Sequence, residues 1–290
     1  MRAPMFVPEP TADGSYTFFS EAFGEAFHSR QGARQEAINK FALPCLLDRR
    51  ARALEVVRVL DVCYGLGYNT AAAIATVWEA NPRCRVEVVG LEADLRVPQQ
   101  AVAQDLLRDW MPPVPELMAA IAVEGAVRTP QVAARLLVGD ARETLQQVAA
   151  EGFQADAVLL DPFSPRRCPQ LWTVEFLGAI ARCLAPGGRV ATYSCSAAVR
   201  TALLMAGLRF GSIAWGSRSP GTIACFDGME VPPLTLPERE HLQTRAAVPY
   251  RDPRLADDSE AIRQRREREQ ETCALEATSQ WRRRWREVLL

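Results

Sequence analysis

A glycine-containing turn directly after an unbroken aliphatic run is the feature that most constrains the fold of this chain. The run Val56–Val62 has the composition of a strand buried on both faces, and the turn after it contains Gly65 and Gly67. The alanine-rich stretch 70–79 that follows is predicted to be helical. Such a strand–turn–helix unit lets backbone amides at the helix N-terminus approach a phosphate or carboxylate. We therefore expect a parallel sheet with a ligand site at its carboxyl edge.

Strands and helices continue to alternate along the chain. Further strands are expected at 85–91, 135–138, 157–160 and 188–193, with helices at 95–110, 141–150 and 173–184. This alternation is typical of an α/β, Rossmann-like fold, a mostly parallel sheet with helices on both faces. The proline-rich stretch 112–115 predicts a loop insertion between the second and third strands.

Segments of different character flank this core. Residues 11–28 alternate aromatic and polar side chains around turn residues, which indicates short strands, and Ser29 is a candidate cap for a helix reaching about Leu47. At the other end, a proline-punctuated stretch leads into a helical tail with a Trp281–Arg286 cluster, suited either to capping the fold or to binding RNA phosphates and bases. The expected parts are an N-terminal extension or lid (1–50), a core (51–231) and a C-terminal extension (232–290).

Composition excludes several classes of protein. With 290 residues, 48% hydrophobic and 24% charged, the chain has an ordinary globular make-up, and no apolar run reaches the roughly 18 residues of a membrane span. We expect a cytoplasmic protein that does not enter a membrane. Eight cysteines without Cys-x-x-Cys spacing and only two histidines predict free thiols and no metal site. Of 34 basic residues only Lys40 is a lysine; arginine suits phosphate recognition, but the net charge of −1 limits it to a local patch.

Polar residues follow several of the predicted strands. Glu92 ends the second strand, where an acid can accept hydrogen bonds from ribose hydroxyls. Asp140 follows the third strand and is suited either to an adenine amino group or to capping the next helix. Asp161 and Phe163, separated by Pro162, follow the fourth strand and place a carboxylate and an aromatic ring at the same edge.

The order of these motifs resembles that of class I S-adenosyl-L-methionine-dependent methyltransferases. The order is glycine loop, ribose acid, adenine-side Asp, Asp-Pro-Phe, and a Leu-x-Pro-Gly-Gly turn ending at Gly188. Thr70 stands where a nicotinamide-binding fingerprint has its third glycine. S-adenosyl-L-methionine is therefore the cofactor that the resemblance implies. The implied cofactor-binding residues are Asp61, Cys63, Gly65, Gly67, Asn69, Glu92, Asp140 and Ala141.

Two longer motifs narrow the resemblance. The stretch 159–172 is similar to the Leu-Asp-Gly-Phe-Ala-Pro…Asn-Pro-x-x-Trp signature of MnmC-type tRNA methyltransferases, and 191–200 to their Ala-Thr…Ser…Val-Arg motif. The N-terminal 13–37 region resembles the stand-alone members, which lack the fused oxidase domain. Cys63 and Pro162 replace family glycines. The resemblance implies methylation of 5-aminomethyl(-2-thio)uridine at the tRNA wobble position to its 5-methylaminomethyl form, by a monomer that binds the anticodon region and uses neither metal nor FAD.

The same resemblance implies roles for residues of the site. As catalytic residues, Asp161 would accept a hydrogen bond from the substrate amine and Phe163 would offer a π face to the ammonium, although a structural turn and core packing are the competing interpretations. Trp172 is suited to stacking on a base or to packing in the core. The implied substrate-binding residues are His28, Ser29, Arg30, Glu36, Trp172 and Arg218.

Two other functions fit parts of the pattern. The same scaffold serves methyltransferases that act on other amines or small molecules. A nucleotide-binding Rossmann oxidoreductase, or a non-catalytic cofactor-sensing protein, would use a similar glycine turn.

Overall fold

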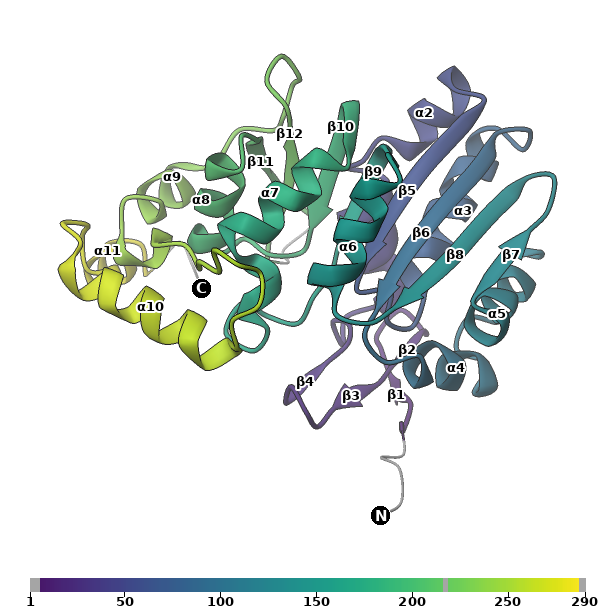
Figure 1. Cartoon of the computed structure of the whole chain (residues 1–290), viewed down its shortest axis with the longest axis horizontal. Helices are drawn as coiled ribbons and strands as arrows, with labels where there is room; N and C mark the ends of the chain where they lie inside the picture. The colour runs from purple at the N-terminus through teal and green to yellow at the C-terminus, as the bar shows by residue number, and fades with distance from the viewer. Residues whose placement is uncertain (1–5, 216–218, 287–290) are drawn as a thin grey trace. The chain divides into compact units, whose positions relative to one another are not determined.

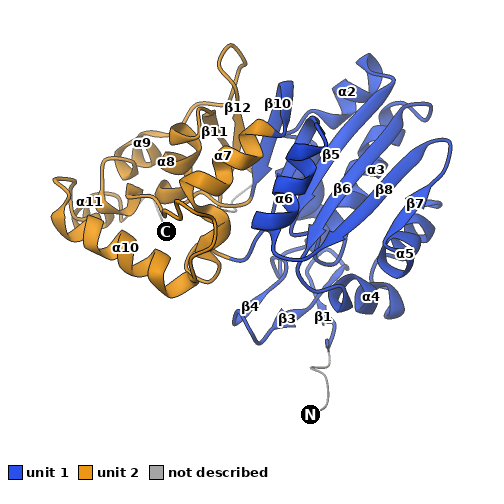
Figure 2. Cartoon of the chain, in the orientation of Figure 1, with its two compact units in different colours: residues 1–163, 183–192 blue, residues 164–182, 193–290 orange. Residues whose placement is uncertain are grey.

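The computed structural model describes residues 6–215 and 219–286, which form two compact units. Unit 1 contains residues 1–163 and 183–192, and unit 2 contains 164–182 and 193–290 (Figure 2). The units interleave along the chain, so the three-part division expected from the sequence stays a prediction.

Unit 1 is built on a mostly parallel sheet, which confirms the predicted fold class. Its strands lie in the order β10-β9-β5-β6-β8-β7, and only the β7–β8 pair is antiparallel (Figure 1). The bounds are β5 Val56–Val62, β6 Arg85–Glu92, β7 Ala126–Arg128, β8 Val132–Val138, β9 Ala155–Leu160 and β10 Leu184–Thr192. The central strands β5 and β9 are almost wholly buried, as their continuous aliphatic runs require.

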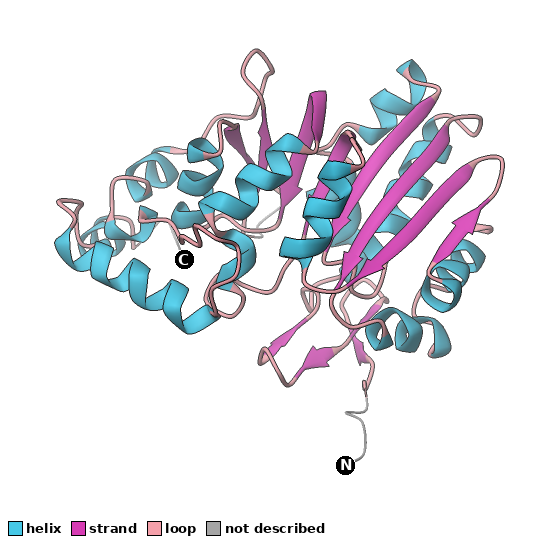
Figure 3. Ribbon diagram, viewed as in Figure 1, coloured by secondary structure: helices cyan, strands magenta, loops and turns pink. Residues whose placement is uncertain are grey.

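Helices cover both faces of this sheet (Figure 3). In the view of Figure 1, α6 lies in front of the strands and α3 behind them. Three consecutive alanines of α3, residues 71–73, are fully buried, because small side chains let the helix approach its neighbours closely. The helices that belong wholly to the core of unit 1 are α3 Tyr68–Ala80, α4 Arg96–Ala103, α5 Val114–Glu124 and α6 Ala141–Ala150.

Two predictions for the segment between β6 and β8 are wrong. The helix expected at 95–110 ends at Ala103, because Asp105 adopts a left-handed conformation (φ 59°) that a helix cannot continue through. The proline-rich stretch expected to be a loop instead begins α5. Pro115 lies in its first turn, where the missing N–H costs no hydrogen bond.

The N-terminal segment forms short strands, as expected. Two antiparallel pairs join β1 Glu9–Pro10 to β2 Tyr16–Thr17 and β3 Phe19–Ser20 to β4 Glu25–Ala26. They are followed by α1 Ala33–Glu36, the π-helical segment η1 Ala37–Ala42 and α2 Leu47–Ala53.

The predicted cap Ser29 is wrong. The helix begins after Gly32, and its first amides are bound by residues far back in the sequence. The Asp13 carboxylate accepts from the amide of Gln35 (2.8 Å), and the Ser15 hydroxyl accepts from that of Ala33 (3.0 Å). These side chains satisfy the donors that an N-terminal cap would otherwise bind.

Unit 2 contains an antiparallel pair of strands and several helices. The strands are β11 Arg209–Ile213 and β12 Gly221–Cys225, neither of which was predicted. The helical elements are η2 Pro169–Trp172, α7 Val174–Arg182, α8 Ala197–Met205, α9 Leu236–His241, η3 Arg245–Ala247, α10 Ser259–Thr272 and α11 Thr278–Arg284. Within the described parts of the chain, no helix is long and apolar enough to cross a membrane.

The C-terminal tail is helical, as predicted, but consists of two helices. Trp281 of α11 is buried: its ring stacks on His241 at 4.0 Å, and its indole N–H donates to the carbonyl of Pro237. Trp285 donates to the Glu240 carboxylate at 2.8 Å. Both rings are thus engaged within unit 2, which favours the capping interpretation over RNA binding.

Candidate functional site

The turn after β5 has the backbone shape that its glycines predicted. Cys63, Gly65 and Gly67 all have positive φ (67°, 55° and 89°). A side chain at position 67 would meet the Tyr64 hydroxyl at 2.9 Å, so the tight packing of Tyr64 requires glycine there. Cys63 is strained in this conformation, and such strain is concentrated at functional sites.

Asp61 lies fully buried beside this turn. One carboxylate oxygen, Oδ2, accepts from the Thr70 hydroxyl at 2.6 Å, while Oδ1 has no hydrogen-bond partner among the described residues. Burial raises the pKa of Asp61 to about 7, and the nearby Glu92 adds to this rise against the opposing bond from Thr70. A buried carboxylate with an unused oxygen is suited to a cationic or N–H-bearing ligand group.

Glu92 connects the end of β6 to the glycine turn. Its Oε2 accepts from the amide of Gly65 at 2.7 Å, and its Oε1 accepts from the amide of Asp94 at 2.9 Å. Burial raises its pKa despite these bonds. The carboxylate therefore shapes the turn, and each of its oxygens has further lone pairs for ribose hydroxyls.

Asp161 follows β9 at the same carboxyl edge. It is held there by its own amide, which donates to the carbonyl of Val62, and by the Asn69 side-chain amide, which donates to its Oδ2 at 2.8 Å. Burial raises the pKa of Asp161 well above its ordinary value, and the charge of Glu36 raises it further. Asn69 has a second polar atom, Oδ1, that is buried and lacks a partner within the described chain.

Phe163 belongs to a cluster of three aromatic rings. Phe23, from the turn between β3 and β4, stacks on it with ring centroids 4.2 Å apart, and Phe27 meets it edge-on at 5.0 Å. A Cβ at Gly65 would lie 3.5 Å from Phe27. The N-terminal segment therefore lies over both the glycine turn and the Asp161 loop, as expected of a lid. One face of Phe163 is already covered by Phe23, which supports packing as at least part of its role.

Asp140 and Ala141 open α6 after β8. The Asp140 carboxylate caps the helix by accepting from the amide of Arg142 at 2.9 Å, and the Arg142 guanidinium binds both its oxygens. Although burial opposes it, these bonds lower the pKa of Asp140. The capping interpretation is thus confirmed, and a contact with adenine stays a prediction.

The predicted substrate-side residues of the N-terminal segment differ in placement. Glu36 is buried, accepting from the amide of Ser29 at 3.0 Å and from the Lys40 ammonium at 3.0 Å. Arg30 is exposed and pairs with Glu9. His28 is buried edge-on against Tyr68, and its Nδ1 has no partner among the described residues.

The burial of His28 predicts an acid-sensitive fold. Burial lowers its pKa to about 4, so an unfolded chain, with a histidine pKa near 6.5, binds the proton first. Stability is complete above about pH 6.5 and should fall by roughly 3 kcal/mol as the pH approaches 4. Histidine NMR should show the His28 ring neutral down to about pH 4, whereas a midpoint near 6.5 in the folded protein would contradict its burial.

The remaining two predicted substrate residues lie outside this cluster. Trp172 is fully buried in unit 2, edge-on to Tyr193 at 6.1 Å, so its ring offers no open face and the packing interpretation is favoured. Arg218 lies outside the described residues.

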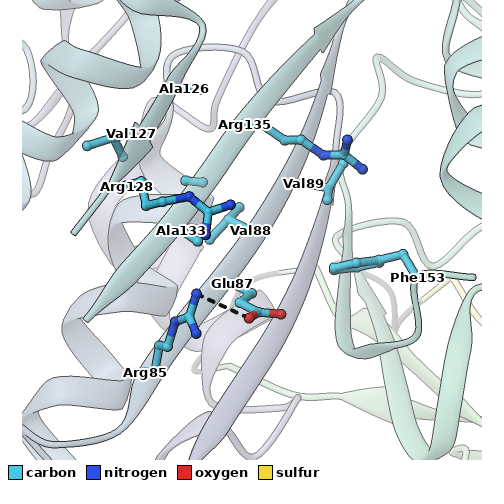
Figure 4. Close-up of a pocket in the computed structure, with 11 residues that line it drawn as sticks. Arg85, Glu87, Val88, Val89, Ala126, Val127, Arg128, Ala133, Arg135 and Phe153 are labelled. Atoms are coloured by element: carbon cyan, nitrogen blue, oxygen red, sulfur yellow. Dashed lines mark ion pairs between the residues drawn. The ribbon is translucent and has the colours of Figure 1, made fainter. Parts of the chain in front are cut away.

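A hollow elsewhere on unit 1 contains none of the predicted residues. It lies over β6, β7 and β8 and is lined by Arg85, Arg128 and Arg135 with Glu87 (Figure 4). Glu87 pairs with Arg85, and Arg135 pairs with Glu151. Within residues 6–215 and 219–286, no three His, Cys, Asp or Glu side chains gather in a way that could hold a metal ion.

Sequence reasoning missed three members of the site. Phe23 and Phe27 carry no motif of their own, although aromatic residues are unusually dense in that segment. Lys40 had a signal that was noted but not connected to the site, since it is the single lysine of the chain.

Known proteins share this fold and these motifs. A family model described as S-adenosyl-L-methionine-dependent methyltransferase matches residues 98–225. The crystal structure of MNMC2 from Aquifex aeolicus is similar with a TM-score of 0.81 and 33% sequence identity, covering 94% of this chain and 87% of that one.

Curated relatives agree over a shorter part of their length. The tRNA 5-methylaminomethyl-2-thiouridine biosynthesis bifunctional protein MnmC of Paracidovorax citrulli is 34% identical over 67% of this chain and 31% of its own. An uncharacterized protein of Methanocaldococcus jannaschii is 29% identical over 90% of this chain and 71% of its own. This chain therefore spans about a third of the bifunctional relatives that it matches.

Proposed function

Because this chain belongs to the MnmC-type family of S-adenosyl-L-methionine-dependent methyltransferases, we propose that it methylates the amine of 5-aminomethyl(-2-thio)uridine at the tRNA wobble position. The product is 5-methylaminomethyl(-2-thio)uridine. The observation that carries the proposal is the buried Asp161 carboxylate, held by Asn69 at the carboxyl edge of β9 beside the glycine turn. That placement brings an acceptor for an amine next to the cofactor's expected position.

The residues at this edge fit S-adenosyl-L-methionine. The unpartnered oxygens of Asp61 and Asn69 would accept from its amino acid part, whose ammonium needs buried acceptors. Cys63, Gly65 and Gly67 would line that part, Glu92 would bind the ribose, and Asp140 with Ala141 would meet the adenine. The cofactor, when bound, supplies an electrophilic methyl group on a positively charged sulfur.

The chain's own residues prepare the amine. An alkylammonium has no lone pair to donate, so Asp161 would accept its hydrogen bond and then its proton. The neutral nitrogen is held in line with the sulfur–methyl bond, and that bond breaks as the nitrogen–methyl bond forms. Phe163, with Phe23 and Phe27, would exclude water and face the new ammonium.

The partner of this reaction is the anticodon region of tRNA. His28, Ser29, Arg30, Glu36 and Arg218 would contact it or shape its entry, since the N-terminal segment lies over the Asp161 loop. The chain works as a monomer in the cytoplasm and performs methyl transfer without metal or FAD.

Labelled cofactor tests the proposal directly. tRNA carrying 5-aminomethyluridine is incubated with the protein and [methyl-¹⁴C]S-adenosyl-L-methionine, then digested to nucleosides. Label in 5-methylaminomethyluridine is the expected result. Label in another nucleoside, or transfer only to small amines, would replace the proposal with the other methyltransferase function.

We expect Glu92→Ala to weaken binding of S-adenosyl-L-methionine at least about tenfold, since losing a hydrogen bond to a charged group costs about 1.5–3 kcal/mol. Isothermal titration calorimetry measures the effect. Glu87→Ala is the matched control: it lies on the same strand, away from the carboxyl edge, and pairs with Arg58. Wild-type affinity in Glu92→Ala would remove this residue from the cofactor site.

A further inference from the structure

Lys40 is an exception in a chain that otherwise uses arginine. It is the single lysine among 34 basic residues, and it is buried, with 6% of its surface exposed. A buried cation is costly unless it is paired, and its partner here is the carboxylate of Glu36 at 3.0 Å. Both side chains are over nine-tenths buried.

The backbone around this pair is also unusual. Glu36 ends α1, and Lys40 lies within the π-helical segment η1, a rare geometry that often marks functional sites. The second oxygen of Glu36 accepts from the amide of Ser29 at 3.0 Å, which ties the pair to the N-terminal segment. His28 also faces Glu36 electrostatically, but as a neutral ring its influence is small.

The pair acts on Asp161. Four side chains influence that carboxylate: Glu36 and Lys40 from the α1–η1 segment, Asn69 from α3 and Asp61 from β5. Glu36 and Asp61 raise the pKa of Asp161, whereas Lys40 and the hydrogen bond from Asn69 lower it. Lys40 is therefore the cation that opposes two buried acids around the proposed catalytic residue.

We propose that Lys40 and Glu36 are positioning residues that set the charge on Asp161, so that its carboxylate is ionised when the substrate amine arrives. This inference rests on the proposed function, since it assigns the pair a part in the same proton transfer. An ionised Asp161 takes the proton from the ammonium and becomes a carboxylic acid, which leaves the amine neutral. A protonated Asp161 has no place for that proton.

The choice of lysine fits this role. An ammonium is a compact charge with three donors, which suits the narrow space between Glu36 and the neighbouring helix turns. A guanidinium is larger and planar, so arginine, which serves everywhere else in the chain, would displace the groups around it.

The test compares the pH dependence of single-turnover methyl transfer in three variants. Glu36→Gln removes an acid and should move the acidic limb of the rate profile about one pH unit lower, while Lys40→Met removes the cation and should move it about one unit higher. The double variant should lie between them. The ratio of variant to wild-type rate cancels the ionisation of the substrate, which is the same in every assay.

Folding is controlled separately. Lys40→Met leaves Glu36 buried without its cation, so it is the variant most prone to unfolding. If it does unfold, the double variant still reports on Lys40, because its acidic limb should lie above that of Glu36→Gln. Asp48→Asn is the matched control: it breaks an exposed Asp48–Arg52 pair of the same spacing and should move nothing.

The outcomes separate this inference from the proposed function. Limbs that coincide in all variants, with tRNA still methylated, would overturn the role of the pair and leave the function intact. A wild-type protein that methylates no tRNA at any pH would overturn the function itself. Titration of ¹³C-labelled Asp carboxyl groups, assigned with Asp161→Asn, measures the same shifts without turnover.

Discussion

Asp161→Asn should lower the rate of methyl transfer by about 10²–10⁴, the usual effect of removing a positioned acid–base group. The substitution is nearly isosteric, and the new side-chain oxygen can still accept from Asn69. Affinity for S-adenosyl-L-methionine and the melting temperature should therefore stay close to wild type. Single-turnover rates, calorimetry and thermal unfolding together measure the three quantities.

The deficit of this variant should shrink as the pH rises. At high pH more of the substrate amine is neutral before it binds, so less depends on Asp161 as proton acceptor. Asp156→Asn is the control, because Asp156 lies at the amino end of the same strand and accepts from the amide of Arg58. An Asp161→Asn protein that is equally slow at every pH would assign the residue to positioning alone, and an unfolded one would assign it to the turn.

Arg200→Met should lower the free energy of unfolding by about 3–5 kcal/mol, the cost of leaving a buried charge without its partner. Arg200 is 2% exposed and pairs with Glu238 at 2.9 Å, while its guanidinium also donates to the Thr222 hydroxyl and the Gly221 carbonyl. Denaturant unfolding at neutral pH measures the loss.

Two further variants show whether the stranded charge is the cause. Arg200→Met combined with Glu238→Gln removes both charges and keeps the capping box that Glu238 forms with Thr235, so it should recover much of the stability. Arg209→Met breaks an exposed pair with Asp227 and should cost less than about 1 kcal/mol. A loss of that small size in Arg200→Met would contradict the proposed cost.

The sheet could be predicted because its strands carry their own signal. Val56–Val62 is buried on both faces and therefore aliphatic throughout, and the structure begins and ends β5 at these residues. Helix α5 was missed because the prolines before it suggested a loop, although Leu117, Met118, Ile121 and Ala122 form a buried stripe with helical spacing.

The site could be predicted where it is local in sequence. The residues that follow the ends of β5, β6, β8 and β9 gather because parallel strands share a carboxyl edge. Contacts made by the N-terminal segment could not be predicted in this way. Asp13 and Ser15 bind amides of α1, and Phe23 reaches Phe163, through tertiary packing that no spacing reveals.

The strand order of unit 1 also has a consequence during protein synthesis. β5 lies between β6 and β9, so it has one paired edge once β6 has been made and waits for its other partner until Leu160 has left the ribosome. β9 in turn waits for β10, which comes only after residues 164–182 of the other unit have been added. At about 5–20 residues per second these intervals last seconds, during which an apolar strand edge is open to pairing with other chains. Nascent chains that stall before residue 192 are therefore the forms of this protein most exposed to aggregation and most dependent on chaperones.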